Sequence, residues 1–156
     1  MKTILLLVGK TIDKHLAAGI NDYAARIAHY MPFEIITIPE LKNTKSLSEE
    51  QQKTMEGELI LKQLQPSDTV VIMDEHGKEY RSIEYARWLE QKRNTARRLV
   101  FIIGGPYGFS SKVYERADEK ISLSKMTFSH QMVRLIMTEQ IYRACTIIKG
   151  EPYHHE

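Results

Sequence analysis

Short apolar runs alternate along this chain with longer segments that carry apolar residues at helical spacing. Four runs rich in Val, Ile and Leu predict strands, at Thr3 to Val8, Phe33 to Ile38, Thr69 to Met73 and Leu99 to Ile103. A shorter candidate for a last strand lies at Lys120 to Leu123. Buried strands that alternate with helices are typical of a largely parallel sheet covered by helices on both faces. The pattern predicts a single α/β domain over residues 1–156, without an internal repeat or a linker.

Capping residues and prolines mark the expected helix boundaries. Asp13 is the expected N-cap of a first helix, which Pro32 stops. Ser48 and Gln51 form a capping-box pattern that starts a second helix, running to about Leu64. The remaining expectations are a polar loop at Asp74 to Tyr80, a helix capped by Ser82 that runs to about Asn94, a short helix that starts near Ser110, and a last helix from Gln131 to Thr146.

The last predicted helix carries apolar residues around most of its circumference. Only a narrow polar stripe remains, through Gln131, Arg134 and Thr138. A helix at the edge of a small domain needs only one apolar face. The surplus fits either deep burial within one chain or a self-complementary surface between two copies, and we favour a homodimer.

Composition narrows the class of protein. Cys145 is the only cysteine, and its apolar helical surroundings favour a buried small hydrophobe over a catalytic thiol. Without an intrachain disulfide or a signal peptide, a cytoplasmic location is expected. The apolar run Ile4 to Val8 is too short to span a bilayer, so no membrane association is expected. The net charge of +2 does not by itself indicate a nucleic-acid binder, and the basic cluster around Arg97 fits a solvated helix end as well as a phosphate contact.

Candidate chemistry lies where the predicted strands end. Ligands of parallel α/β sheets bind beyond the carboxyl ends of the strands, which here selects Met73 to Gly77, Gly104 to Ser110, and Leu123 to His130. The pair Gly104-Gly105 either lets the backbone approach a flat ligand or simply forms a tight turn, and sequence chemistry does not decide between them.

Several familiar sites are missing. There is no phosphate-binding P-loop, no G-x-G-x-x-G dinucleotide fingerprint and no G-x-S-x-G nucleophile elbow. The six histidines show no zinc-ligand spacing, so no metal site is predicted. These absences disfavour a nucleotide hydrolase. The ending Glu151 to Glu156, with a proline, an aromatic ring and two imidazoles, looks unlike a frayed terminus.

Several motifs in the right order resemble the ribosomal RNA large subunit methyltransferase H family. They span the chain from end to end: Leu6-x-Val8-Gly9-Lys10, Met31-Pro32-Phe33-Glu34, Ile103-Gly104-Gly105-Pro106-x-Gly108, Leu123 to His130, Val133-Arg134-Leu135 with Glu139 and Tyr142-Arg143-Ala144, and Pro152-Tyr153-His154-x-Glu156. The resemblance implies a SPOUT-type fold whose C-terminal segment is threaded into a trefoil knot. Knots are rare enough that sequence physics would argue against one.

The resemblance also implies an activity and its partners. The expected reaction moves a methyl group from S-adenosyl-L-methionine to N3 of a pseudouridine in 23S rRNA on the assembled ribosome, leaving S-adenosyl-L-homocysteine. The enzyme would be a homodimer. Carried over position by position, the cofactor contacts fall on Met73, Gly104, Gly105, Ser124, Lys125, Met126, Thr127, Phe128 and Ser129. Two positions depart from the family pattern: Met73, where leucine is frequent, and His155, where arginine is common.

The acceptor side of the reaction is expected to involve the tail. We assign it to His130, Tyr153 and His154, with Arg134 and Arg143 orienting uracil carbonyls or phosphates. The alternative for the two arginines is pairing with acids such as Glu139 at a dimer seam. The alternative for the whole chain is a non-catalytic RNA- or nucleotide-binding ribosome assembly factor.

Overall fold

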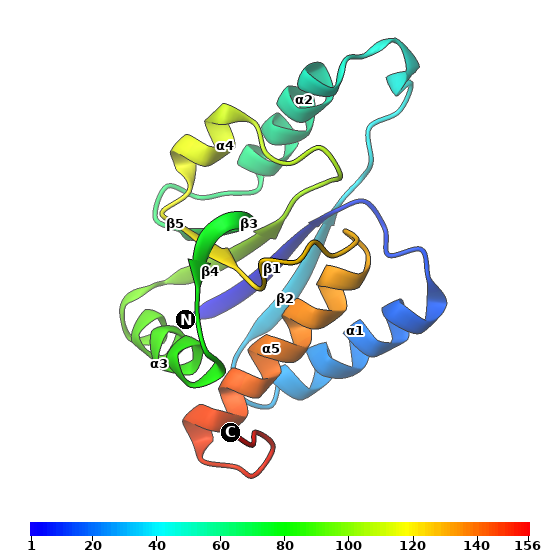
Figure 1. Ribbon diagram of the computed structural model, residues 1–156. Helices are drawn as coiled ribbons and strands as arrows, with labels where there is room; N and C mark the ends of the chain where they lie inside the picture. Colours follow the sequence, from blue (N-terminus) through cyan, green and yellow to red (C-terminus); the bar gives the residue numbers. More distant parts are fainter.

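The computed structural model describes residues 1–156 and contains one five-stranded sheet in which every neighbouring pair is parallel. The strand order is β2-β1-β4-β3-β5. The strands are β1 (Lys2–Val8), β2 (Phe33–Ile38), β3 (Thr69–Glu79), β4 (Arg98–Ile103) and β5 (Glu119–Ser122). The helices are α1 (Lys14–Ile27), α2 (Glu49–Lys62), α3 (Ser82–Thr95), α4 (Ser111–Arg116) and α5 (Met132–Lys149), with a 3₁₀ turn at Thr44–Ser46 (Figure 1). The predicted α/β domain with a parallel sheet is confirmed.

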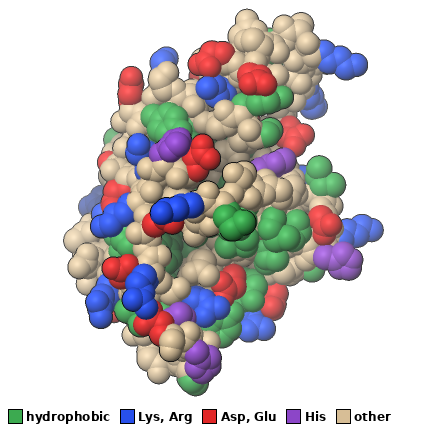
Figure 2. Space-filling model, in the orientation of Figure 1, with side chains coloured by type: hydrophobic (Ala, Val, Ile, Leu, Met, Phe, Trp, Pro, Cys, Tyr) green, Lys and Arg blue, Asp and Glu red, His purple; other side chains and the backbone are tan.

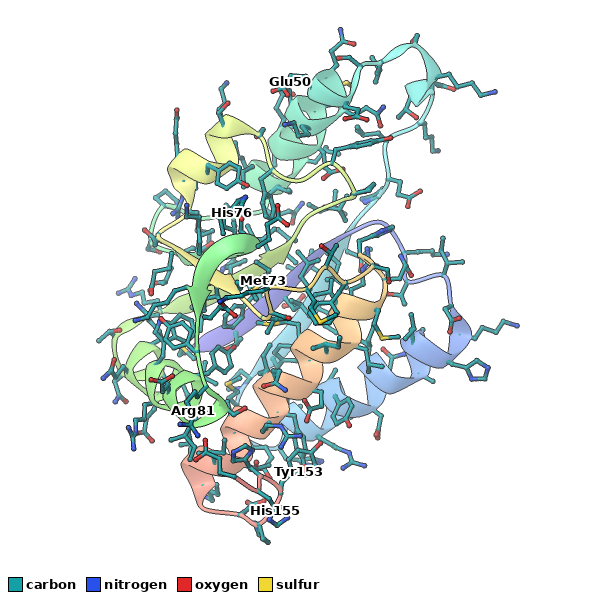
Figure 3. All side chains as sticks on the ribbon, viewed as in Figure 1. Glu50, Met73, His76, Arg81, Tyr153 and His155 are labelled. Carbon is teal, nitrogen blue, oxygen red and sulfur yellow. The ribbon has the colours of Figure 1, made fainter.

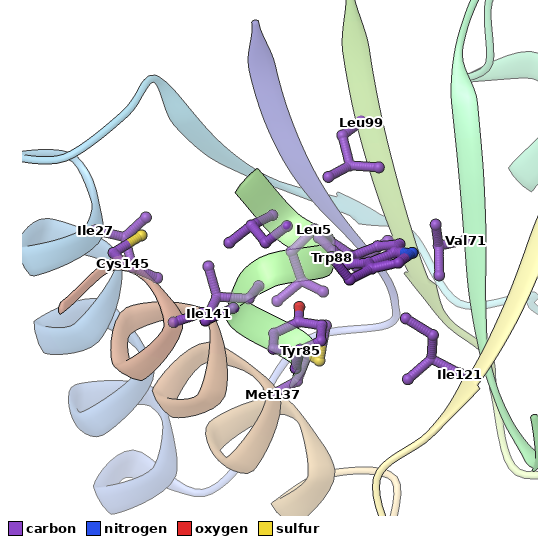
Figure 4. Packing of buried hydrophobic residues seen from close by; sticks show 14 of the residues in the cluster. Leu5, Ile27, Val71, Tyr85, Trp88, Leu99, Ile121, Met137, Ile141 and Cys145 are labelled. Atoms are coloured by element: carbon purple, nitrogen blue, oxygen red, sulfur yellow. The ribbon is translucent and has the colours of Figure 1, made fainter. Parts of the chain in front are cut away.

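Alternate residues of the central strands supply two separate cores. Leu5, Leu7 and Phe101 face a cluster that includes side chains of α1, α3 and α5, with Trp88 and Met137 among them (Figure 4). The intervening residues of the same strands face α2 and α4, where Ile60 and Val113 are fully buried. Because strand side chains alternate between faces, a strand that is apolar throughout must be covered on both. Helices on both faces are therefore confirmed.

Most predicted helix starts are confirmed by their caps. Asp13 accepts hydrogen bonds from the backbone N–H groups of His15 and Leu16, and Ser48 and Gln51 form a complete capping box. The Ser82 cap is wrong by one residue, because Arg81 is the N-cap of α3. The carboxylate of Glu84 accepts the Arg81 backbone N–H at 2.8 Å, which moves the helix start to Ser82.

The predicted polar loop at Asp74 to Tyr80 is wrong for most of its length, because β3 continues to Glu79. Both Met73 and Lys78 pair with Ile121 of β5, so the residues between them bulge out of the ladder. A side chain at Gly77 would lie 2.6 Å from the backbone of Ile121, so the absence of a Cβ lets the two strands meet again after the bulge. The polar composition of this segment reflects the bulge and an exposed strand end.

α5 crosses the face that it shares with α1 and α3 and contacts both helices (Figure 1). Its expected polar stripe is wrong: Arg134 and Thr138 are completely buried. Cys145 is buried as predicted. Gly150, with φ of +76°, ends the helix in the left-handed conformation that favours glycine. None of the helices combines the length and the apolar character that crossing a membrane requires.

Candidate functional site: a pocket at the carboxyl edge of the sheet

The main pocket has a volume of about 500 Å³ and lies beyond the carboxyl ends of β4 and β5, beside the bulge in β3. The three segments selected from the sequence all contribute to its wall. Of the expected site residues, those that line it are Met73, Gly104, Gly105, Ser124, Met126, Thr127, Phe128 and His130. Lys125 and Ser129 are exposed side chains outside the lining. The structure thus brings most of the expected cofactor residues together with His130.

Ser129 has a structural task that explains its position outside the lining. Its hydroxyl accepts the backbone N–H of Met132 at 3.1 Å, and its carbonyl accepts that of Val133 at 3.0 Å. Ser129 therefore stabilises the turn that leads into α5, which begins at Met132. Ser124 shapes the other end of the segment, because its hydroxyl accepts the Met126 N–H at 3.0 Å while its carbonyl accepts the Ser122 hydroxyl at 2.9 Å. The segment between β5 and α5 is therefore held at both ends by serine side chains.

The β3 bulge places a carboxylate in the pocket wall, at Asp74. Its oxygens accept hydrogen bonds from the Tyr114 hydroxyl and from the His76 backbone N–H, the latter at 2.8 Å. Partial burial on its own would raise the pKa of Asp74, but these hydrogen bonds outweigh it and lower the pKa below the usual range. Asp74 therefore presents a negative charge at neutral pH. The sequence alone did not single out Asp74 or Tyr114, although Asp74 follows Met73 directly.

At the glycine turn, other parts of the protein lie where side chains would be. A Cβ at Gly104 would lie 2.9 Å from the Phe109 ring, and one at Gly105 would lie 2.7 Å from the Glu56 carboxylate. Gly108 has φ of +83°, and its N–H closes a turn with the Gly105 carbonyl at 3.2 Å. Packing within the chain thus accounts for the glycine at 104, where a Cβ would meet the Phe109 ring, while a Cβ at 105 would displace the Glu56 carboxylate.

The remaining expected residues form a second cluster at the far end of α5. The Glu139 carboxylate accepts hydrogen bonds from Arg143 at 2.6 Å and from the Tyr153 hydroxyl at 3.0 Å. The Arg143 guanidinium lies 4.8 Å from the centre of the Tyr153 ring. Burial raises the pKa of Tyr153, and hydrogen bonding with Tyr23 and Glu139 raises it further, so its hydroxyl stays protonated at neutral pH. We name Glu139, Arg143, Tyr153 and His154 the tail cluster.

The tail cluster also fixes the role of the His154 ring. Nδ1 lies 3.0 Å from the Arg143 guanidinium, which can only donate. Nδ1 therefore accepts, and the proton of the neutral ring lies on Nε2. That nitrogen is buried and has no hydrogen-bond partner within the chain. The neighbouring Glu156 reaches Arg81 at 3.3 Å, so the tail is tied to α3 as well as to α5.

Within one chain the pocket and the tail cluster are separate. From Met132 to Arg143 α5 rises about 16 Å. Figure 3 shows Met73 at the pocket end, and Tyr153 and His155 beyond the other end of the helix. The structure thus does not bring His130 into contact with Arg143, Tyr153 or His154 of the same chain.

Arg134 occupies neither of these two places. Its guanidinium donates to the carbonyls of Val8 at 2.6 Å and Gly9 at 2.8 Å, and to the Thr11 hydroxyl at 3.0 Å. Its Nε reaches the His130 carbonyl at 3.2 Å. The expectation that Arg134 orients an RNA base is wrong, because this side chain is completely buried and its donors are used inside the fold. Arg143 pairs with Glu139, as the alternative expected, but within a single chain.

Comparison with known proteins identifies the family. The family model described as predicted SPOUT methyltransferase matches residues 1–154. The chain is 66% identical to the ribosomal RNA large subunit methyltransferase H of Bacteroides fragilis, and the match covers all of both chains. The corresponding proteins of Phocaeicola vulgatus and Porphyromonas gingivalis are 64% and 54% identical, again over the full length of both chains. The chain belongs to the ribosomal RNA large subunit methyltransferase H family.

A solved structure supports the fold independently. The crystal structure of a probable methyltransferase from Bordetella pertussis Tohama I aligns with a TM-score of 0.53, covering 92% of this chain and 93% of that one. Its sequence identity is 8%, so the likeness concerns the fold alone. For this methyltransferase H family member, the match to the SPOUT model includes both the pocket and the tail cluster as far as His154.

Proposed function

We propose that this chain transfers a methyl group from S-adenosyl-L-methionine to N3 of a pseudouridine in 23S rRNA on the assembled ribosome. The observation that carries the proposal is full-length identity of 66% to a ribosomal RNA large subunit methyltransferase H. The pocket at the carboxyl edge of the sheet supports it, because its wall contains seven of the nine cofactor residues that the resemblance implies, together with His130. A ribosomal substrate also argues for a location in the cytoplasm.

The chemistry of the pocket fits S-adenosyl-L-methionine. A volume of about 500 Å³ is within the usual range for small-molecule sites. Met73, Ile103 and Leu123 provide apolar surface suited to a purine ring, and the Asp74 carboxylate provides a counter-charge for a cationic ligand or an acceptor for hydroxyl groups. The bound cofactor would supply a methyl group on a positively charged sulfur, which leaves as neutral S-adenosyl-L-homocysteine.

The chain's own residues must align the acceptor nitrogen and take up its proton. In the transfer, the bond from N3 to the methyl carbon forms as the sulfur–carbon bond breaks, so holding the two reactants in line is the main task. His130 is the imidazole of the expected acceptor set that lines the pocket, and we assign it to receive the N3 proton. Arg143 has N–H groups beyond those that meet Glu139 and His154, and these donors are suited to uracil carbonyls or phosphates.

We further propose that the enzyme works as a homodimer in which the partner's tail completes the site. The separation along α5 supports this, because one chain cannot present both its pocket and its own tail cluster to one base. The Gln131 side chain accepts the Ile12 backbone N–H at 2.8 Å and donates to the Lys10 carbonyl at 3.1 Å, which holds the loop before α1 against the start of α5. Ile12, Met126 and Met132 expose large apolar side chains, of which 77%, 79% and 41% are accessible. Hydrophobic side chains gather over this end of α5 in Figure 2, a surface suited to a second copy.

The decisive experiment is mass mapping of 23S rRNA from a strain lacking this gene, before and after addition of purified protein and S-adenosyl-L-methionine. One added methyl group on a pseudouridine supports the proposal. Assembled ribosomes should react faster than free rRNA fragments, because a chain of net charge +2 neutralises few phosphates and needs a preformed surface. Ribosome binding without methylation would instead indicate a non-catalytic assembly factor.

Two finer points belong to the same proposal. Turnover measured against pH for His130→Ala and His154→Ala tests the acceptor assignment, and unchanged turnover in both would remove them as catalysts.

The trefoil knot implied by the family is supported by the shared SPOUT model. It is tested by pulling the two ends of one unfolded chain, since a knot keeps the extended length short of the roughly 3.3–3.6 Å per residue of an open chain.

A further inference from the structure

The glycine turn of the pocket is attached to α2 through the side chain of Glu56. The Glu56 carboxylate accepts the backbone N–H of Gly105 at 3.1 Å. Lys53 lines the pocket one helical turn earlier, on the same face of α2. α2 thus borders the pocket with Lys53 and holds the turn with Glu56, although it contributes nothing to the strand ends that form the rest of the site.

Glu56 occupies the space that a side chain at position 105 would need. A Cβ added to Gly105 would lie 2.7 Å and 2.9 Å from the two carboxylate oxygens. The Gly105 carbonyl is also used, because it accepts the Gly108 N–H at 3.2 Å. Both polar backbone groups of Gly105 are therefore bound within the chain. Its N–H is thus not free for a ligand, and the residue contributes to the pocket through the shape of the turn.

The next residue of α2 holds the far end of the same loop. Gly57 is buried, and a Cβ there would overlap the side chain of Ser110. Ser110 is the N-cap of α4, and its hydroxyl accepts the Val113 N–H. Glu56 and Gly57 of α2 thus contact the loop where it leaves β4 and where it enters α4. α2 therefore supports this wall of the pocket at both ends of the loop.

A charged carboxylate at position 56 is unfavourable for the stability of the fold. Glu56 is half-buried and forms no salt bridge with a cation, although the Glu40 carboxylate is close enough to act on it. Burial raises the pKa of Glu56, the Gly105 N–H partly offsets this, and Glu40 raises it further. A group that is unfavourable for stability and yet shapes a binding wall is typical of functional sites.

We propose that Glu56 is a positioning residue for the cofactor: its carboxylate holds the Gly104–Gly108 turn in the shape that forms one wall of the pocket. The inference rests on the proposed function, namely that this pocket binds S-adenosyl-L-methionine. Glu56 touches neither reacting group. Its loss should therefore weaken cofactor binding while leaving the methyl-transfer step intact once the cofactor is saturating.

The test is calorimetric titration of S-adenosyl-L-homocysteine into full-length variants. Glu56→Ala should weaken binding by about tenfold, which corresponds to about 1.4 kcal/mol. Glu56→Gln keeps an acceptor oxygen at the same reach and should stay within about twofold of wild type. Glu58→Ala, an exposed acid two residues along the same helix, is the matched control and should not change the Kd. The KM for S-adenosyl-L-methionine should rise in Glu56→Ala with kcat at saturation nearly unchanged.

A second pair of variants tests the geometry. Gly105→Ala should weaken binding in the wild-type background, where the new Cβ meets Glu56, and should add little further loss when combined with Glu56→Ala. If Glu56→Ala does not fold, Glu56→Asp carries the test, because it keeps the charge but cannot reach Gly105 and should also weaken binding.

The outcomes separate the two proposals. Equal affinity of wild type, Glu56→Ala and Glu56→Asp, or full additivity of Gly105→Ala and Glu56→Ala, would overturn the positioning role while leaving the methyltransferase assignment intact. A wild-type protein that does not bind S-adenosyl-L-homocysteine would overturn the cofactor assignment itself.

Discussion

Replacing Arg134 with methionine should cost the fold much of its stability. The change keeps an apolar stem of similar length but removes a guanidinium that is completely buried and donates to Val8, Gly9, Thr11 and His130. The two shortest of these bonds, at 2.6 Å and 2.8 Å, end on carbonyls inside the protein. At about 1–3 kcal/mol for each buried acceptor deprived of its donor, the loss should be about 3–5 kcal/mol.

Urea unfolding followed by circular dichroism measures this loss directly. In a thermal scan of the same variant the unfolding temperature should fall by roughly 10 °C, at about 2–4 °C per kcal/mol for a chain of this size. Arg87→Met is the control, because Arg87 is an exposed residue on α3 and its replacement should change the free energy of unfolding by less than about 0.5 kcal/mol. A loss below about 1 kcal/mol for Arg134→Met would refute the reasoning, since a buried network of this kind cannot be that weak.

Three further changes have defined outcomes. Tyr114→Phe removes the hydroxyl that helps to lower the pKa of Asp74; a carboxylate with a lowered pKa stabilises the fold above its unfolded pKa of about 3.9 and loses this effect as the pH falls. The variant should therefore lose less than about 1 kcal/mol at pH 7, because the pair is partly exposed, and less than that at low pH, as two urea titrations would show. Met132→Glu should convert a species of about twice the 18.1 kDa chain mass into one of the chain mass in analytical ultracentrifugation, and an unchanged mass would rule out this surface as the interface. Burial raises the pKa of Cys145 to about 11, so at pH 8 its thiol should react with a disulfide reagent only when urea unfolds the chain, and rapid reaction of the folded protein would contradict the burial.

The fold was predictable where local chemistry and burial act together. β1 and β4 are apolar throughout because helices cover both faces of the sheet, and the capping box at Ser48 marks the start of α2 without reference to the rest of the chain. β3 was predicted too short because polar residues after Met73 look like a loop, while their pairing with β5 depends on a strand almost fifty residues away. Such a partner leaves no local signal.

The site was predictable as a set of strand ends but not as a set of contacts. The topological rule brought Met73, Gly105 and Ser124 to one pocket because parallel strands end at a common edge. It could not find Glu56, whose side chain is one of several acids on a polar helix and is distinguished only by the backbone N–H that it meets. The role of Arg134 was predicted wrongly for a related reason. Helical spacing shows which residues share a face of the helix, but it does not show which carbonyl groups lie opposite that face.

α5 carries the pocket at one end and the tail cluster at the other, so it sets an angle as well as a distance. Each residue inserted into it would turn the tail cluster by about 100° around the helix axis and move it by about 1.5 Å. The pocket and the tail cluster would then face different directions, even if every side chain were kept. Length variation among relatives should therefore fall in surface loops such as 39–47, while the residue count between His130 and Arg143 stays constant.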